Sequence, residues 1–362
     1  MSLTVRNLDI SLQGVRVLRD VSFDGADGEF LSLLGASGAG KTTTLKAISG
    51  ILRPDSGTIE IDGNVVNDLP SHRRHTPVVF QDVRLFPNMS IEENVAFPLK
   101  VQGVPRRERI ARARELLRFM HLEELGARGI HEVSGGQQQR TALARAIAAE
   151  PRVLLLDEPF SGLDESLRDE MRDAVMDVHR TLGITTVLVT HDATEALMLS
   201  DRIVYLADGR VVQSATPKDL YEHPATPEVA ACFGDCTICG GAIVNGIYVS
   251  NQLAVPCAGG CAAECTQGGP ATAVIRHRGV TIQPIGNLEV LGSIYCGDTY
   301  LVRVNTGEDV LTGRSACAYA AGDRVDIDVA WDSLFVFAET DAEPRPVRDF
   351  VMNADEASKD CA

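Results

Sequence analysis

The stretch that most constrains this chain is Gly35-Ala36-Ser37-Gly38-Ala39-Gly40-Lys41-Thr42, which reads G-x-x-x-x-G-K-T. The apolar run Phe30–Leu34 ends directly before it, and Thr42–Ser49 has the composition of a helix opening. A strand, a glycine loop and a helix N-terminus in this order attract phosphate, because backbone N–H groups converge there and the helix dipole adds positive charge. The spacing therefore predicts a P-loop, with Lys41 on the β- and γ-phosphates of a nucleotide and the Thr42 hydroxyl on Mg²⁺.

An acidic pair farther along the chain indicates what happens to the nucleotide. Four apolar residues, Val153–Leu156, deliver Asp157 and Glu158 to the end of a predicted strand. In a P-loop sheet such a pair lies beside the phosphates. We expect Asp157 to hold Mg²⁺, directly or through water, and Glu158 to orient and deprotonate the attacking water.

A second anion-binding terminus is predicted at Ser134-Gly135-Gly136-Gln137, where a helix begins. One chain needs only one cradle for a γ-phosphate. The second cradle therefore suggests that two chains hold the nucleotide between them, in a symmetric pair with two shared sites.

Composition narrows the class of protein. The 362 residues are enough for two domains with a large buried core. The net charge of −16 argues against a nucleic-acid-binding surface, which needs a basic face. No apolar run approaches the roughly 20 residues that span a bilayer, and no signal-peptide pattern opens the chain. We therefore expect a soluble protein that starts in the cytosol and reaches a membrane only through partners.

The chain is predicted to contain two domains of different texture. Strands alternate with helices through residues 1–230, which indicates a mostly parallel sheet with helices on both faces, and residues 82–150 form a helical, more basic part. Residues 231–340 read as short strands between glycine turns, Ala242–Val249 among them, and are typical of a small closed β-barrel. Residues 341–362 read as an acidic flexible tail.

These motifs resemble the nucleotide-binding subunits of ATP-binding cassette (ABC) transporters, in the order and spacing of that family. The resemblance covers roughly residues 3–230. It is carried by six motifs: the Walker A loop Gly35–Thr42, a Q-loop at Gln81, the signature Val133–Gln137, Walker B at Val153–Glu158, the D-loop Ser161–Asp164, and the switch His191.

The resemblance implies roles that residue types alone do not. Gln81 would contact Mg²⁺ and the attacking water, and His191 would hold the γ-phosphate and position Glu158. Ser134 and Gly136 would contact ATP held by the other protomer. Thr43, Gly135, Gln137 and Asp164 are assigned to the nucleotide site on the same ground. The family usually has an aromatic residue that stacks on adenine, whereas this chain has Leu12 there, so an apolar contact would replace stacking.

The resemblance also implies a branch of the family. Residues 85–90 and 158–164 resemble importers for polyamines, ferric iron, quaternary amines, sulfate or maltose, whose ATPase subunits carry a C-terminal OB-like (TOBE) domain. The implied protein is an ATPase of a binding-protein-dependent importer at the cytoplasmic face of the cell membrane. Its partners would be a second ABC subunit, transmembrane permease subunits and, indirectly, an extracytoplasmic substrate-binding protein. Polyamine, ferric iron and quaternary amine are the favoured cargoes.

Two alternatives stay open at this stage. A soluble ABC ATPase of DNA repair or chromosome maintenance also carries these motifs, although the acidic charge and the accessory barrel argue against it. The spacing of Cys232, Cys236 and Cys239 could ligate an iron–sulfur cluster or zinc, and Cys257, Cys261 and Cys265 could add ligands. The competing interpretation is a reduced, cysteine-rich loop at the domain junction.

Overall fold

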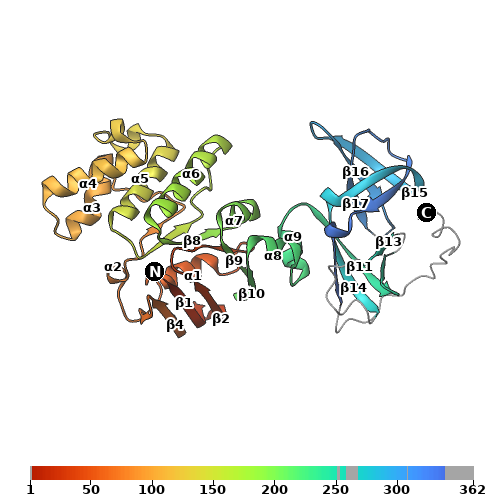
Figure 1. Cartoon of the computed structure of the whole chain (residues 1–362), viewed down its shortest axis with the longest axis horizontal. Coiled ribbons are helices and arrows are strands. Elements are labelled where there is room, and N and C mark those ends of the chain that lie inside the picture. Colours follow the sequence, from red (N-terminus) through yellow and green to blue (C-terminus); the bar gives the residue numbers. More distant parts are fainter. Residues whose placement is uncertain (1, 251–252, 258–267, 308, 339–362) are drawn as a thin grey trace. The chain divides into compact units, whose positions relative to one another are not determined.

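The computed structural model describes residues 2–250, 253–257, 268–307 and 309–338 (Figure 1). The predicted acidic tail, residues 341–362, lies outside them. The chain divides into two compact units, Met1–Leu220 and Tyr221–Ala362. The sequence predicted this boundary after residue 230, so the observed division lies earlier in the chain.

The first unit is built on a six-stranded sheet of order β10-β9-β3-β8-β7-β6. All of its strands except β10 run parallel. The carboxyl ends of the parallel strands therefore meet at one edge, where ligands bind in open α/β sheets. The strands are β3 (Phe30–Leu34), β6 (Val78–Val79), β7 (Val153–Asp157), β8 (Thr185–Thr190), β9 (Arg202–Ala207) and β10 (Arg210–Ala215).

A four-stranded antiparallel sheet of order β2-β1-β4-β5 completes the strands of this unit. The strand pair predicted over residues 3–23 is confirmed, because β1 and β2 pair along most of their length. The antiparallel patch predicted after the P-loop helix is confirmed as well. The strands are β1 (Leu3–Leu12), β2 (Val15–Gly25), β4 (Ser56–Ile61) and β5 (Asn64–Val65).

Figure 1 shows α3, α4 and α5 gathered on one side of the first unit and the antiparallel strands with α1 on the other. Ala113 and Leu117 of α4 are buried while its arginines are mostly exposed, as the 3.6-residue period predicts. The helices of this unit are α1 (Lys41–Ile48), α2 (Ser71–Arg74), α3 (Ile91–Val101), α4 (Arg106–Phe119), α5 (Gly135–Ala148), α6 (Glu165–Leu182) and α7 (Ala193–Leu199).

Two hydrophobic cores lie on the two faces of the six-stranded sheet. Side chains alternate along a strand, so Leu154 and Leu156 of β7 pack with the helices while Val153 and Leu155 pack toward α1 and the antiparallel sheet. This is why the strand is apolar throughout. A strand buried on both faces holds its terminal residues firmly, and Asp157 is the last residue of β7.

Short helices α8 (Pro217–Glu222) and α9 (Pro227–Cys232) precede the strands of the second unit. One sheet has the order β13-β12-β11-β14-β19, and in the other β15 pairs with β16, β17 and β18. The predicted all-β C-terminal domain is confirmed. Its strands are β11 (Cys236–Val244), β12 (Ile247–Ser250), β13 (Leu253–Pro256), β14 (Gly269–Arg276), β15 (Val280–Tyr295), β16 (Tyr300–Asn305), β17 (Val310–Ser315), β18 (Arg324–Val329) and β19 (Leu334–Ala338).

One predicted strand of this unit is wrong. Ala242–Val249 is not continuous, because β11 turns into β12 at Asn245 and Gly246, and Val244 pairs with Ile247. Both turn residues have positive φ, 52° and 77°. Asn-Gly is the preferred pair for a two-residue hairpin turn, so the sequence did carry the signal.

Candidate functional site

The P-loop, Gly35–Thr42, connects β3 to α1 as its sequence predicts. The Lys41 side chain is buried, and its ammonium donates to the carbonyl oxygens of Gly35 at 2.7 Å and Ala36 at 2.9 Å. These bonds fold the loop around the lysine. The loop therefore places a positive charge inside the turn whose N–H groups would face phosphate.

The glycines of this loop are required by geometry. A Cβ on Gly35 would lie 2.1 Å from the carbonyl oxygen of Leu206 in β9, so no larger residue fits between the loop and the sheet. Gly40 caps the N-terminus of α1 with φ of 100°, a conformation that L side chains rarely adopt. The motif is thus fixed by the close approach of the backbone to its own sheet.

Thr42 and Asp157 are brought together by the strand order. The Thr42 hydroxyl donates to Asp157 Oδ1 at 2.9 Å. Burial raises the pKa of the Asp157 carboxyl, and the hydrogen bond from Thr42 acts in the opposite direction. A hydroxyl and a buried carboxylate side by side are hard oxygen ligands, which Mg²⁺ prefers. The pair therefore fits the predicted magnesium site.

Glu158 and His191 also meet at this edge. Glu158 Oε2 lies 3.1 Å from His191 Nδ1, and the Glu158 side chain is 22% exposed against 61% for His191. Glu158 has φ of 48°, and its backbone N–H donates to the carbonyl oxygen of Val189 at 2.9 Å. A non-glycine residue in the left-handed region is uncommon and occurs often at functional sites. The strained backbone turns the carboxylate from the end of β7 toward His191.

Gln81 follows β6, and its amide Nε2 donates to the hydroxyl of Ser161 at 3.1 Å. Ser161 is the first residue of the predicted D-loop. The structure therefore joins the Q-loop to the D-loop. A contact of Gln81 with Mg²⁺ stays a prediction.

The Ser134–Gln137 turn starts α5 with a reciprocal cap. Ser134 Oγ accepts from the N–H of Gln137 at 3.3 Å, and Gln137 Oε1 accepts from the N–H of Ser134 at 2.9 Å. Gly136 faces Leu167 of α6, where an added Cβ would lie 3.1 Å from a methyl group. In the part of the chain that the structure describes, the hydrogen bonds of Ser134 and Gln137 do not reach the P-loop. Contact with nucleotide through a partner copy stays a prediction.

The remaining predicted nucleotide residues lie at element ends. Leu12 ends β1, opposite Val15, and is 39% exposed. Asp164 caps the N-terminus of α6 by accepting from the N–H of Leu167 at 2.9 Å. Thr43 lies in the first turn of α1. Their contacts with nucleotide are not tested by this geometry.

The sequence reasoning missed a buried hydrogen-bond network that holds the His191 loop. Glu195 Oε2 accepts from the Thr190 hydroxyl at 2.5 Å, and Thr190 Oγ1 accepts from the N–H of Asp192 at 3.0 Å. The Asp192 carboxylate in turn caps α7. The pattern D-x-x-E at 192–195 is a helix N-terminus signature and could have identified the cap. The contact with Thr190 depends on tertiary packing.

This network leads to a pH prediction. Burial raises the pKa of the Glu195 carboxyl. A carboxyl with a higher pKa in the folded chain stabilises the fold at low pH and loses that contribution as the pH rises through the folded-state value. We expect Glu195→Gln, which keeps an acceptor for Thr190, to raise the urea midpoint at pH 7. The gain should shrink toward about pH 4, where the wild-type carboxyl is protonated. A lower midpoint at pH 7 would show that the charge of Glu195 stabilises the fold.

The cysteine arrangement does not fit the metal alternative. Cys236 packs with Val274 on one face of the sheet, while Cys239 is buried with Ala273 on the other. Positions three apart on a strand point to opposite faces, so Cys232, Cys236 and Cys239 cannot share one ion. Among the described residues, no group of three or more His, Cys, Asp and Glu could hold a metal. Cys261 and Cys265 lie outside the described residues.

The alternative of a cysteine-rich loop is also wrong for two of these residues, because Cys236 and Cys239 belong to β11. Burial raises the pKa of the Cys239 thiol to about 12. This thiol therefore stays protonated near neutral pH and behaves as a small apolar core residue.

Comparison with known proteins places these motifs in context. A family model described as ABC transporter matches residues 18–161. The spermidine/putrescine import ATP-binding protein PotA of Oleidesulfovibrio alaskensis is 48% identical over 239 residues, which are 65% of this chain and 64% of that protein. The match thus spans less than two thirds of the length of this curated relative.

Two solved structures also match part of this chain. A dimeric post-hydrolysis state of the ATP-binding cassette MJ0796 bound to ADP and Pi is 32% identical, with a TM-score of 0.54 over 59% of this chain and 98% of that one. CbiO1 from Clostridium perfringens, part of the ABC transporter complex cbiONQ, is 31% identical, with a TM-score of 0.56 over 60% of this chain and 89% of that one. The P-loop, the acidic pair and His191 lie at one sheet edge, and this chain belongs to the ABC transporter family.

Proposed function

We propose that this chain is the ATP-hydrolysing subunit of a binding-protein-dependent importer and that it works as a pair around two ATP molecules. The observation that carries the proposal is the meeting of Thr42 with Asp157 and of Glu158 with His191 at the sheet edge that holds the P-loop. The soluble DNA-maintenance alternative is not favoured, because PotA and CbiO1, which are both named for transport, are 48% and 31% identical to this chain.

The residues at this edge have different roles in ATP hydrolysis. Lys41 and the loop amides bind and orient the phosphates. Thr42 and Asp157 would hold Mg²⁺, which when bound supplies positive charge to the phosphate oxygens. The Glu158 carboxylate accepts a proton from the attacking water, and His191, 3.1 Å away, keeps that carboxylate in place. The products are ADP and phosphate.

In the proposed dimer, each copy of the chain completes the nucleotide site of the other copy. The N-terminus of α5 presents Ser134 and two glycines, with open space at Gly135. The solved cassette MJ0796 is described as dimeric with ADP and Pi bound, which supports pairing in this chain. We infer that the Ser134 turn of one copy faces the P-loop of the other.

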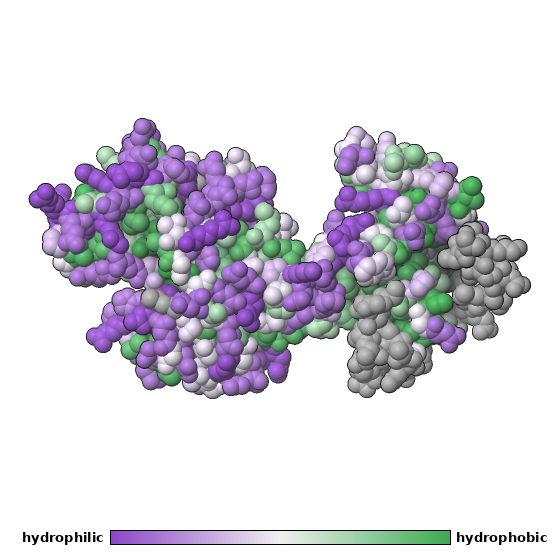
Figure 2. Space-filling model, viewed as in Figure 1, coloured by the Kyte–Doolittle hydropathy of each residue, from purple (hydrophilic) through white to green (hydrophobic). Residues whose placement is uncertain are grey.

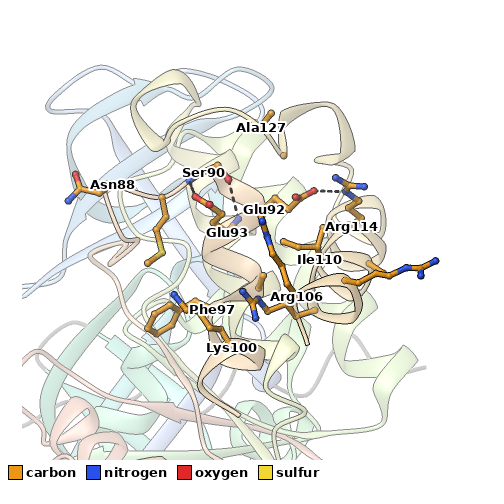
Figure 3. Close-up of a pocket in the computed structure, with 16 residues that line it drawn as sticks. Asn88, Ser90, Glu92, Glu93, Phe97, Lys100, Arg106, Ile110, Arg114 and Ala127 are labelled. Carbon is orange, nitrogen blue, oxygen red and sulfur yellow. Dashed lines mark hydrogen bonds and ion pairs between the residues drawn. The ribbon is translucent and has the colours of Figure 1, made fainter. Parts of the chain in front are cut away.

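A cavity of about 1200 Å³ marks the expected contact with a permease. It lies between residues 88–90, α3, α4 and the loop at 126–127 (Figure 3). Met89, Ala96, Phe97 and Ile110 supply its apolar surface. Figure 2 shows apolar areas within a mostly hydrophilic surface over this region. A segment with an apolar face fits such a cavity.

The charges around this docking cavity (the lining of residues 88–90, α3, α4 and 126–127) are unbalanced. Lys100, Arg106, Arg107, Arg109 and Arg114 line it. Both acidic lining residues are engaged, Glu92 with Arg114 at 2.6 Å and Glu93 with the N–H of Ser90 at 3.1 Å. Because five basic and two acidic side chains line the cavity, its net charge is positive. We infer that the docking segment of the permease carries acidic side chains beside its apolar face.

The cargo and the location follow from the relatives. PotA is named as a spermidine/putrescine import protein, so we propose a polyamine as the cargo class. Among the described residues, no helix is long and apolar enough to cross a membrane. The proposed location is the cytoplasmic face of the cell membrane, held there by permease subunits that an extracytoplasmic binding protein supplies with substrate.

Charge reversal in the docking cavity tests the permease contact. Arg106 occupies the first position of α4, where an acidic residue favours the helix, so Arg106→Glu should fold normally. We expect Arg106→Glu to reduce recovery of the permease from detergent-solubilised membranes by about tenfold, because like charges would then meet. The measurement is an affinity pull-down with mass spectrometry.

The matched control is Arg210→Glu, the same change at an exposed position on β10. It should recover the permease as the wild-type chain does. Equal recovery with Arg106→Glu would refute the docking cavity. Recovery of DNA without any membrane protein by the wild-type chain would refute the importer.

A further inference from the structure

The segment that leads from the Q-loop to the docking cavity is held from two sides. We call residues 84–90 the connecting segment. On one side Arg145, near the C-terminal end of α5, donates to the carbonyl oxygen of Arg84 at 2.7 Å. The Arg145 guanidinium also lies 5.5 Å from the centre of the Phe86 ring. A cation over an aromatic face is attracted by the ring, so α5 contacts both the backbone and a side chain of the segment.

Helix α3 holds the same segment from the other side. The rings of Phe86 and Phe97 are 4.4 Å apart at their centres. The buried Asn94 amide accepts from the N–H of Phe86 at 2.8 Å and donates to the carbonyl oxygens of Phe86 at 3.2 Å and Ser90 at 3.0 Å. Ser90 and Phe97 line the docking cavity. Phe86 therefore links α5 to residues that a permease would touch.

The position of Arg145 is not explained by an ion pair. Within the described residues no carboxylate forms an ion pair with it, and burial lowers its pKa. Arg145 is half-buried, and holding a cation there without a carboxylate costs free energy that an apolar side chain would avoid. The contacts that compensate the cost are those with Arg84 and Phe86.

The position of Arg145 on α5 connects these contacts to the Ser134 turn at the start of the same helix. Helix α5 starts at the Ser134 turn, which we place against the nucleotide of the other copy, and it runs for 14 residues, about 21 Å. A continuous helix moves as one body. Displacement of the Ser134 turn when two copies close therefore displaces Arg145 and, through it, the connecting segment.

We propose that Arg145 is a positioning residue that transmits closure of the paired cassettes to the docking cavity through Arg84 and Phe86. The proposal rests on the proposed function. It assigns to one side chain the coupling between the nucleotide held by the partner copy and the surface that meets the permease.

The test measures hydrogen exchange of the backbone amides in residues 84–90 by mass spectrometry. The full chain carries Glu158→Gln so that ATP with Mg²⁺ locks the pair. We expect locking to slow exchange of the connecting segment about tenfold, within the usual range of coupling between sites. Adding Arg145→Met should remove this slowing while light scattering still reports the pair. Phe86→Leu should have the same effect, and Phe86→Tyr, which keeps the ring, should not.

Arg112→Met is the matched control, because it removes an exposed arginine from the same group of helices. It should keep the slowing. Slowing that persists with both Arg145→Met and Phe86→Leu overturns the inference, since the segment would then respond by another route. If Arg145→Met does not fold, the two Phe86 variants decide the outcome. Failure of Glu158→Gln alone to pair with ATP would instead refute the proposed function, and the inference with it.

Discussion

Glu158→Gln is expected to abolish ATP turnover while ATP binding and pairing persist. The amide keeps the size of the carboxylate and can still contact His191, but it cannot accept a proton from water. Loss of a general base costs about 10²–10⁴-fold in rate. Phosphate release should therefore fall by at least about a hundredfold. Light scattering with ATP and Mg²⁺ should show a stable dimer, because bound ATP is no longer consumed.

Glu165→Gln provides the matched control, since it makes the same change at an exposed carboxylate in the first turn of α6. Its phosphate release should match that of the wild-type chain. Hydrolysis by Glu158→Gln near the wild-type rate would show that another group takes the proton. A form of Glu158→Gln that stays monomeric with saturating ATP and Mg²⁺ would show that the two copies do not share the nucleotide.

The parts of this site that the sequence predicts are those written in short, continuous stretches. The P-loop needs glycines where the backbone touches its own sheet, as at Gly35 beside Leu206. Strand β7 is apolar because both of its faces are buried, and it ends at Asp157. Such local rules leave a readable pattern. The same holds for the Ser134 turn, whose cap involves residues three apart.

The parts that the sequence does not predict depend on partners distant in the chain. The hydrogen bond between Thr190 and Glu195 joins residues that are close in the sequence, but it is buried only because α7 packs on the sheet. The contact of Arg145 with Arg84 spans 61 positions. The Phe86–Phe97 pair looks like ordinary core packing in the sequence. The spacing of Cys236 and Cys239 left a metal site open, because spacing alone does not show that these two residues lie on opposite faces of a strand.

The backbone conformation of Glu158 could not be predicted from the sequence either. Glu158 adopts φ of 48° although nothing in its residue type favours the left-handed region. The hydrogen bond from its N–H to Val189 of the neighbouring strand holds this conformation. The role of Glu158 could therefore be predicted from its motif, while the means by which its carboxylate reaches His191 could not.

Lys41→Ala is expected to remove ATP binding, which is the second large effect that we predict. The ammonium is buried in the loop, where a charge interacts with phosphate more strongly than in water. Removal of one such group costs about 3 kcal/mol, so ATP affinity should fall by about a hundredfold or more. Titration with a fluorescent ATP analogue measures the affinity, and phosphate release should be lost with it.

The Lys41 variant must be separated from a simple loss of fold, because the same ammonium donates to the carbonyl oxygens of Gly35 and Ala36. Leaving these acceptors without their donor costs about 1–3 kcal/mol, so a lower melting temperature without nucleotide is expected as well. Lys46→Ala, on the same helix, should lower affinity far less. If Lys41→Ala melts early yet binds ATP as tightly as the Lys46 variant, the lysine serves the loop alone and the P-loop assignment fails. If affinity falls in chain that is still folded, the charge acts on phosphate.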